Sequence, residues 1–478
     1  MGIFKKKIEE EKIEERYILC LDGGGMRGIV PAVLLDKLAQ LMKAYDDKKP
    51  FYSHFDLIAG TSTGGLLALA LTVPPQYMSI PKEAGPTEVI KFEEPKQSFL
   101  DKITKKPTPE KKEDIIIPRA CDCSKLLSLY SENGSKIFPN RTRLFGQMLS
   151  AKYRSEPLEN FLQSLFNEAK MSQCLVPTMT VAYELIEGKP YVFKSWDSKD
   201  FYVKEAARAT SAAPTYFAPV ILHERATDKK LTLIDGGMVA NNPVILAYGE
   251  AKKLYPNCKK FHIISLSTAT QIFRLGDGDI TGSGVMGWID PTKGAPIQKI
   301  YASSQMQMSD YMAYNNDEIE YTRVDYEFES DNFKIDDTTT YAIEKLEEAG
   351  NIVYEKNEER IMNYIENIIK KDDFSHITSQ SHIDEEDKKV LKQYKTETYS
   401  PPEDADLNDK TDDSILDVVE DRTLLERELK QSKFGGLFKR FINTRTAVDN
   451  SNLLPSSTSS NETDQDFSLE TTSDSEKE

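Results

Sequence analysis

A serine framed by two glycines is the first feature of this sequence that could do chemistry. Ser62 lies between Gly60 and Gly64, which matches the pattern G-x-S-x-G. An apolar run at residues 55–59 precedes this motif, and another at 63–71 follows it. A strand, a sharp glycine turn and a helix in this order form the setting of a nucleophile elbow, which holds a serine hydroxyl in the open. The motif therefore predicts a nucleophilic serine, and the alternative is a plain strand-to-helix turn.

A serine hydroxyl needs a base, and the five histidines offer poor settings for one. His54 comes before the strand of the serine motif, His223 stands before a charged turn, and His262 lies inside an apolar run. The other two, His376 and His382, fall in or near a polar C-terminal stretch. We expect all five to be structural or solvated, so the search for a base turns to the carboxylates.

Asp235 is the carboxylate whose position fits that role best. It follows an apolar run at residues 231–234 and precedes Gly236 and Gly237. Strand ends are where α/β sheets gather functional groups, although an aspartate that caps the next helix would show the same pattern. A Ser–Asp dyad is workable when burial makes the carboxylate more basic.

A third motif, DGGGMRG at residues 22–28, follows the first apolar run of the chain. Gly23, Gly25 and Gly28 satisfy the G-x-G-x-x-G pattern of a dinucleotide site, so an NAD-linked oxidoreductase is a rival hypothesis. That site also wants an acidic residue at a strand end about 20 residues later, and the polar residues 44–47 supply no such strand. Stabilisation of the fold by NAD would support the rival.

The same glycines also suit an oxyanion hole. The backbone amides of Gly23, Gly24 and Gly25 could approach a developing alkoxide closely, because no side chain stands in the way. Arg27 would add a positive charge beside a phosphate group. Because the Ser62 motif follows in the next strand-helix unit, we favour this second use of the glycines.

The elements that must position these motifs follow the order of an α/β protein. Continuous apolar runs predict buried strands at residues 17–21, 55–59, 176–183, 231–234 and 261–266. Helical spacing of apolar residues predicts helices at 29–43, 63–71, 156–170, 203–212, 243–254 and 340–370. Strand, glycine turn and helix, repeated twice near the N-terminus, predict an α/β fold.

Composition and charge indicate how the chain is divided into domains. Hydrophobic residues make up 39% of the 478 residues, which indicates that part of the chain is unpacked. The net charge is −17, and residues 401–478 contribute −10 of it. We predict a charged leader at 1–16, a catalytic domain at 17–371 with an exposed, lid-like insertion at 74–118, and a mostly disordered acidic tail at 372–478. This acidity argues against nucleic acid as a partner.

The compartment and membrane contact are also matters of expectation. Five sparse cysteines favour reduced thiols in a cytosol-like compartment. The N-terminus shows no cleavable signal peptide, and no apolar run is long enough to span a bilayer. We therefore expect a cytoplasmic or peripheral membrane protein. Secretion into a host cell without a cleaved signal remains an open alternative. A basic amphipathic segment at 424–445 either packs on the domain or docks on a membrane or partner.

In their order along the chain, the glycine motif at residues 22–28, the serine motif at 60–64 and the aspartate motif at 235–237 resemble those of the patatin-like phospholipase family. Three connecting stretches are similar as well, at residues 133–138, 207–217 and 239–243. The resemblance implies a three-layer α/β/α sandwich with a mostly parallel central sheet. It also implies acyl-ester hydrolysis of lipids without a catalytic metal or other cofactor.

The resemblance also assigns roles to the motif residues. Ser62 would be the nucleophile and Asp235 its general base, the amides of residues 23–25 the oxyanion hole, and Arg27 a support of that loop or a partner of the lipid phosphate. The resulting hypothesis is a phospholipase A that acts on membrane phospholipid at a peripheral membrane surface. The alternatives are a neutral-lipid or lysophospholipid esterase, and a silent or conditionally active effector that needs a protein activator.

Overall fold

The structure is a computed structural model, and the part of it that can be described covers these ranges: residues 14–46, 49–83, 88–90, 115–117, 119–139, 151–225, 227–269, 288, 296–328 and 333–371. All of them belong to one unit of the chain, Met1–Leu391. Most of the predicted leader, and the whole predicted tail with its basic segment at 424–445, therefore lie outside the described residues.

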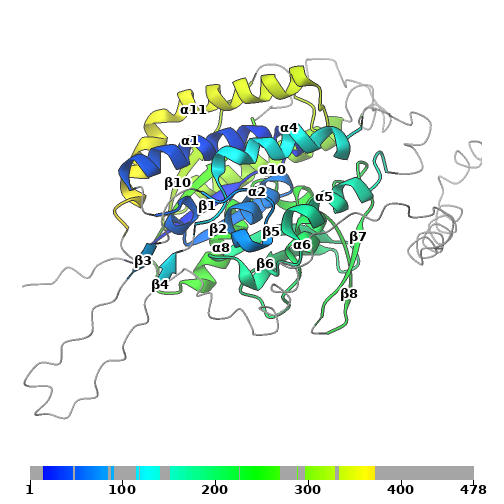
Figure 1. Cartoon of the computed structure of the whole chain (residues 1–478), viewed down its shortest axis with the longest axis horizontal. Helices are drawn as coiled ribbons and strands as arrows, with labels where there is room; N and C mark the ends of the chain where they lie inside the picture. The colour runs from blue at the N-terminus through cyan, green and yellow to red at the C-terminus, as the bar shows by residue number, and fades with distance from the viewer. Residues whose placement is uncertain are drawn as a thin grey trace, which may run out of the picture. The chain divides into compact units, whose positions relative to one another are not determined.

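A mostly parallel sheet forms the centre of this unit (Figure 1). Its strands are β1 (Glu15–Leu21), β2 (Leu57–Thr61), β5 (Thr178–Glu184), β6 (Lys189–Lys194), β7 (Val220–His223), β8 (Lys230–Asp235), β9 (Lys260–Leu266) and β10 (Ile319–Val324). The order is β10-β9-β1-β2-β5-β8-β7, and β6 also pairs with β5. The pairs from β10 to β5 are parallel, whereas β6, β8 and β7 join in antiparallel fashion. All five predicted strands are present.

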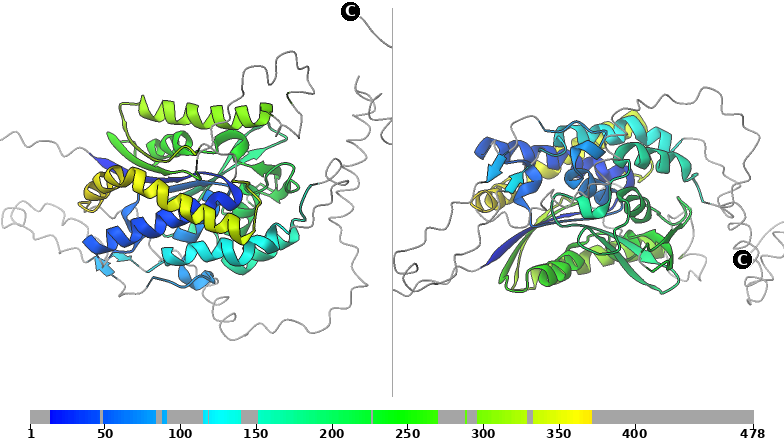
Figure 2. Two further views of the ribbon diagram at one scale, coloured as in Figure 1. Left: turned by 90° about the horizontal axis from the view of Figure 1, so that it is seen from above. Right: turned by 60° about the horizontal axis from the view of Figure 1, so that its bottom comes forward.

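Helices cover both faces of the sheet, so the predicted three-layer α/β/α sandwich is confirmed (Figures 1 and 2). One face carries α1 (Ile29–Tyr45), α2 (Thr63–Thr72), α4 (Leu126–Ile137), α5 (Glu156–Phe166), α6 (Val203–Thr210) and α11 (Thr340–Ile368). The other carries α7 (Gly237–Ala240), α8 (Val244–Leu254) and α10 (Pro296–Tyr314). The six predicted helices are all present, while α4, α10 and the short α7 were not predicted.

Alternating side chains of the central strands fill two cores. In β1, Leu19 and Leu21 pack beneath α1, whereas Ile18 and Cys20 pack beneath α8. Burial on both faces is why these strands are continuous apolar runs rather than alternating ones. All five cysteines are buried and none forms a disulfide.

The insertion predicted at residues 74–118 is not exposed throughout, which corrects the sequence-based expectation. Tyr77 and Ile80 near its start, and Ile117 near its end, are buried in the core. A small antiparallel sheet of β3 (Glu88–Ile90) and β4 (Ile115–Ile117) joins the two ends. The scattered Pro, Lys and Glu of this stretch concealed the few apolar residues that anchor it.

The sheet brings two distant strand ends together on one edge of β5. β2 runs parallel to the first half of that edge, where Thr61 pairs with Val181. β8 runs antiparallel to the second half, where Asp235 pairs with Ala182. Because the two strands run toward each other, their carboxyl ends meet. Ser62, the residue after β2, therefore lies beside Asp235 although 173 positions separate them.

Candidate active site

Ser62 occupies a strained turn between β2 and α2. Its backbone φ is 53° and its ψ is −123°, a conformation that residues with side chains rarely adopt. Strain of this kind is typical of a nucleophile elbow. A Cβ on Gly60 would lie 2.1 Å from the carbonyl oxygen of Gly64, and one on Gly64 would lie 2.3 Å from that of Leu21. Both flanking positions therefore require glycine.

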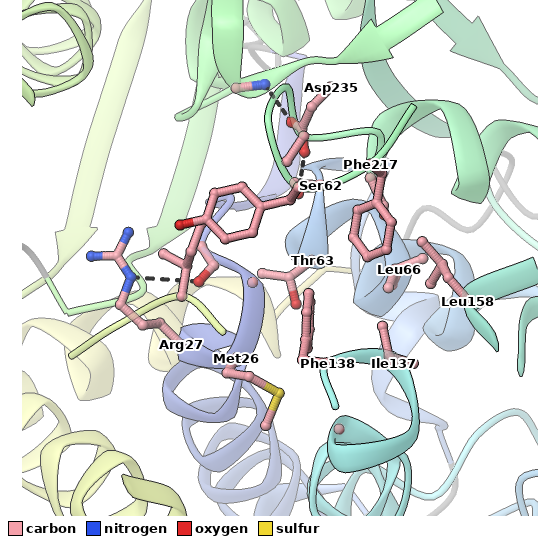
Figure 3. A pocket seen from close by; sticks show the side chains of 18 of the residues that line it. Met26, Arg27, Ser62, Thr63, Leu66, Ile137, Phe138, Leu158, Phe217 and Asp235 are labelled. Carbon is pink, nitrogen blue, oxygen red and sulfur yellow. Dashed lines mark hydrogen bonds between the residues drawn. The ribbon is translucent and has the colours of Figure 1, made fainter. Parts of the chain in front are cut away.

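Ser62 and Asp235 are joined by a hydrogen bond at the centre of the site (Figure 3). The serine hydroxyl donates to Oδ2 of Asp235 over 2.6 Å, and the Gly237 amide donates to Oδ1 over 2.7 Å. Burial raises the pKa of Asp235 to about 6, against the opposite effect of these two hydrogen bonds. Such a carboxylate is ionised at neutral pH and more basic than an exposed one, which suits it to accept a proton.

The glycine loop lies against this pair, and its amides are not equivalent. The amide of Gly23 donates to the Asn241 carbonyl over 3.0 Å, so it is already engaged. Within the described part of the chain, the amides of Gly24 and Gly25 make no hydrogen bond, and both residues line the cavity beside Ser62. Of the three glycines expected to supply oxyanion donors, Gly24 and Gly25 are therefore the two whose amides remain available.

Arg27 lies half-buried at the edge of the same cavity (Figure 3). Its Nε donates to the carbonyl of Gly24 over 3.5 Å, which is a long hydrogen bond. This contact corresponds to the first of the two roles expected for Arg27, that of a support for the glycine loop.

Three side chains that the sequence analysis did not single out hold the loop and the elbow in place. Asn241 donates through Nδ2 to the carbonyl of Gly23 over 3.1 Å, and the Thr268 hydroxyl donates to the same oxygen over 2.9 Å. The Thr210 hydroxyl accepts the amide of Ser62 over 2.9 Å. Two of these side chains could have been found from the sequence, because Asn241 and Thr210 lie in two of the connecting stretches that resemble the family, residues 239–243 and 207–217.

A buried ion pair fixes the start of the glycine loop. Asp22 follows β1, and the Arg323 guanidinium in β10 donates to both of its carboxylate oxygens, over 3.0 and 2.6 Å. Arg323 also donates to the Ser265 hydroxyl over 2.8 Å. The exposed fraction is 5% for Arg323 and 1% for Asp22. This bidentate pair ties the ends of β1 and β10 together, and so determines where the loop begins.

The Ser62–Asp235 pair opens into an apolar cavity of about 260 Å³ (Figure 3). Its walls come mainly from α2, α4, α5 and the segment before β7. Aliphatic and aromatic side chains dominate them: Leu66, Leu67, Leu129, Ile137, Phe138, Leu158, Phe161, Leu165, Tyr216 and Phe217. A lining of this kind excludes water and accepts a hydrocarbon chain.

No histidine from the described ranges lines this cavity. His262 stacks on Tyr17, with ring centroids 4.7 Å apart, and has carboxylates on both sides of its ring. His54 is buried in a short helix before β2, and His223 ends β7. These three are structural or surface residues, as expected, and residues 376 and 382 lie outside the described part.

One known family and several plant proteins are similar to this chain. The profile of a family described as patatin-like phospholipase matches residues 19–248, a range that contains the glycine loop, the elbow and Asp235. Residues 19–248 belong to the patatin-like phospholipase family. Membership of this family implies lipid acyl hydrolase activity.

Plant patatin-like proteins are among the relatives of this chain. Patatin-like protein 2 of Arabidopsis thaliana is 28% identical over 326 residues, covering 62% of this chain and 70% of the relative. Patatin-like protein 2 of Oryza sativa subsp. indica is 25% identical over 392 residues, covering 73% and 86%. The crystal structure of VipD from Legionella pneumophila matches 74% of this chain and 67% of its own at 10% identity, but its TM-score of 0.29 is too low to support a conclusion.

Proposed function

We propose that the patatin-like domain is a phospholipase A that cleaves fatty-acyl esters of glycerophospholipids through a Ser62–Asp235 dyad. One observation carries the proposal: the 2.6 Å hydrogen bond from the serine hydroxyl to a buried carboxylate stands at the head of an apolar cavity. The cavity would hold the acyl chain and place its ester carbonyl at Ser62.

In the first half of the reaction, Asp235 takes the proton of Ser62 while Oγ attacks the ester carbonyl carbon. The carbonyl oxygen becomes an oxyanion, and the amides of Gly24 and Gly25 stabilise it. A single donor of this kind lowers the barrier by about 3–4 kcal/mol in other hydrolases. The ester C–O bond then breaks, Asp235 returns its proton to the departing lysolipid oxygen, and the acyl group remains on Ser62.

In the second half, water replaces the lysolipid. Asp235 takes one proton from this water as its oxygen attacks the acyl-enzyme carbonyl, and the same two amides hold the new oxyanion. When the bond to Ser62 breaks, Asp235 returns the proton to Oγ. The products are the free fatty acid and the starting enzyme, so one carboxylate serves both halves as base and acid.

We also propose a membrane surface as the place where the substrate is met. Arg27, at the edge of the cavity, would face the lipid phosphate while it supports Gly24. We also propose a protein activator as a partner in hydrolysis, and this can be tested. Hydrolysis that appears only when cell extract is added would establish it, and hydrolysis by the purified chain would remove the need for it.

The direct test is product analysis on defined lipids. Phosphatidylcholine with different acyl chains at its two positions should yield one free fatty acid and one lysophospholipid, identified by mass spectrometry. Equal or faster cleavage of triacylglycerol or lysophospholipid would replace phospholipase A by the esterase alternative. No product from any ester, with or without extract, would favour a silent lipid-binding protein.

The raised pKa of Asp235 predicts the acid limb of the pH profile. Asp235 must be ionised to act as a base, so protonation of its carboxylate inactivates the free enzyme. We expect kcat/KM to be constant above neutral pH and to fall tenfold per pH unit below an apparent pKa near 6. Initial rates on a neutral, water-soluble ester between pH 4.5 and 8 would measure it, and a limb centred near pH 4 would contradict a buried base.

A further inference from the structure

Helix α10 carries its apolar residues on the outside of the domain. Seven large side chains are exposed on this helix, and six of them recur at helical spacing and form what we call the α10 face: Ile297, Ile300, Tyr301, Met308, Tyr311 and Met312. Their exposed fractions run from 37% to 65%. A surface helix normally turns such a stripe toward the core. A contiguous apolar stripe on the outside is typical of an interaction surface.

The inward side of α10 holds the small and polar residues. Ser303 and Ala313 are buried against the domain. The Asp310 carboxylate accepts hydrogen bonds from Asn242 over 2.9 Å and from Tyr321 over 2.6 Å. Polar contacts thus fasten the helix to the domain, and its apolar residues are left to a partner.

The α10 face is continuous with the mouth of the active-site cavity. Tyr301 and Ala302 both line the cavity and are exposed on α10. The Tyr301 hydroxyl donates to the carbonyl of Met238 over 3.0 Å, and Met238, itself 37% exposed, lines the cavity too. Whatever covers this face therefore reaches the opening that leads to Ser62.

The near absence of charge on the α10 face indicates what kind of partner it fits. Among its 19 residues the helix has only two charged side chains, Lys299 and Asp310, and both are half-buried. The chain as a whole has a net charge of −17. An uncharged stripe of Tyr, Met and Ile on an acidic protein fits the interface of a zwitterionic leaflet, where tyrosine places its ring among lipids and its hydroxyl in water.

We propose that the α10 face is the surface by which this domain lies on a zwitterionic phospholipid leaflet. The inference rests on the proposed function, because a leaflet on this face would deliver lipid to the cavity mouth. The contact is interfacial: among the described residues, none of the helices is long and apolar enough to cross a bilayer. In Figure 2 (left), α10 lies at the side of the domain away from α1 and α11.

The test compares two pairs of substitutions in the full chain. Met308→Glu with Tyr311→Glu puts two charges on the α10 face without touching a cavity residue. Ile186→Glu with Tyr341→Glu makes the same change in charge at two exposed apolar residues away from α10. Binding is measured by co-flotation with vesicles of diether phosphatidylcholine, which has no acyl ester and is not consumed. A water-soluble short-chain ester reports whether the active site is intact.

We expect the α10 pair to raise the apparent Kd for vesicles at least about tenfold, since two charges must enter the interface. The control pair should bind as the unmodified chain does, and all three should hydrolyse the soluble ester within about twofold of one another. Unchanged vesicle binding by the α10 pair, or an equal loss of vesicle binding by both pairs, would overturn the proposal.

A change from dimer to monomer caused by the α10 pair alone, with vesicle binding retained, would also overturn it, because the face would then join two copies of the chain. Failure of the unmodified chain to cleave any ester, with vesicle binding intact, would overturn the proposed function and leave the docking surface standing.

Discussion

Ser62→Ala is expected to lower kcat/KM for phosphatidylcholine by a factor of about 10⁴ or more, because the variant lacks the hydroxyl that forms the acyl-enzyme in the proposed mechanism. The alanine also removes the hydroxyl that donates to Asp235 over 2.6 Å. Fatty-acid release by the purified variant, followed by mass spectrometry, would measure the effect. A control is Ser128→Ala, which removes an exposed hydroxyl from α4 and should leave the rate unchanged.

Asp235→Asn is expected to abolish hydrolysis to a similar extent and to make the fold more stable. Asparagine can still accept the Gly237 amide, but it cannot take a proton. Burial raises the folded-state pKa of Asp235 from 3.8 to about 6, so its stability contribution is present at low pH and lost as pH rises through 6. At pH 7 the buried charge costs up to about 3 kcal/mol, which asparagine would recover.

Urea denaturation at pH 7 and pH 4 would measure that gain in stability, which should be large at pH 7 and small at pH 4. A dyad is contradicted if either purified variant keeps full activity. An unburied, ordinary aspartate is indicated instead if Asp235→Asn is no more stable than the unmodified chain at either pH.

Arg323→Met is expected to have the largest effect on stability. It removes the partner of Asp22 and leaves that carboxylate buried, and breaking a buried ion pair in this way costs about 3–5 kcal/mol. Because Asp22 precedes the glycine loop, hydrolysis should fall as well. The free energy of unfolding in urea and the rate on a soluble ester would measure the two effects.

Arg225→Met is the matched control for this loss. It breaks a half-exposed pair with Glu205, at 3.4 Å, and such pairs contribute less than about 1 kcal/mol. If Arg323→Met lowers the free energy of unfolding and the hydrolysis rate as little as Arg225→Met does, the Asp22–Arg323 pair does not hold the loop. Adding Asp22→Asn to Arg323→Met should restore part of the stability, because the unpaired buried charge is then gone.

Much of the site could be predicted because its signals are local in the sequence. Gly60 is required by a contact with Gly64 inside the same turn, both glycines belong to one short motif, and Asp235 stands at the end of an apolar strand. The engagement of the Gly23 amide could not be predicted, since its acceptor lies on Asn241, more than 200 residues away. The role of Arg323 is equally remote, because it depends on β10 pairing with β9 beside β1.

The elements that the sequence did not predict also have physical reasons. Helix α10 has its apolar stripe outside and polar anchors inside, so its pattern does not resemble a helix that packs on a core. Strand β6 begins with two exposed residues and then alternates between buried and half-buried ones, and β7 alternates between half-buried and exposed residues. Both therefore lack the continuous apolar runs of the parallel strands. The predicted boundaries of the domain and of its insertion remain predictions.

The head-on meeting of β2 and β8 has a consequence for the timing of synthesis. The ribosome makes Ser62 long before Asp235, and at about 5–20 residues per second the 173 positions between them take roughly ten to thirty-five seconds. Throughout that interval the emerging chain has a serine but no aspartate beside it. The proposed Ser62–Asp235 dyad is therefore incomplete on the nascent chain until β8 pairs with the far half of β5.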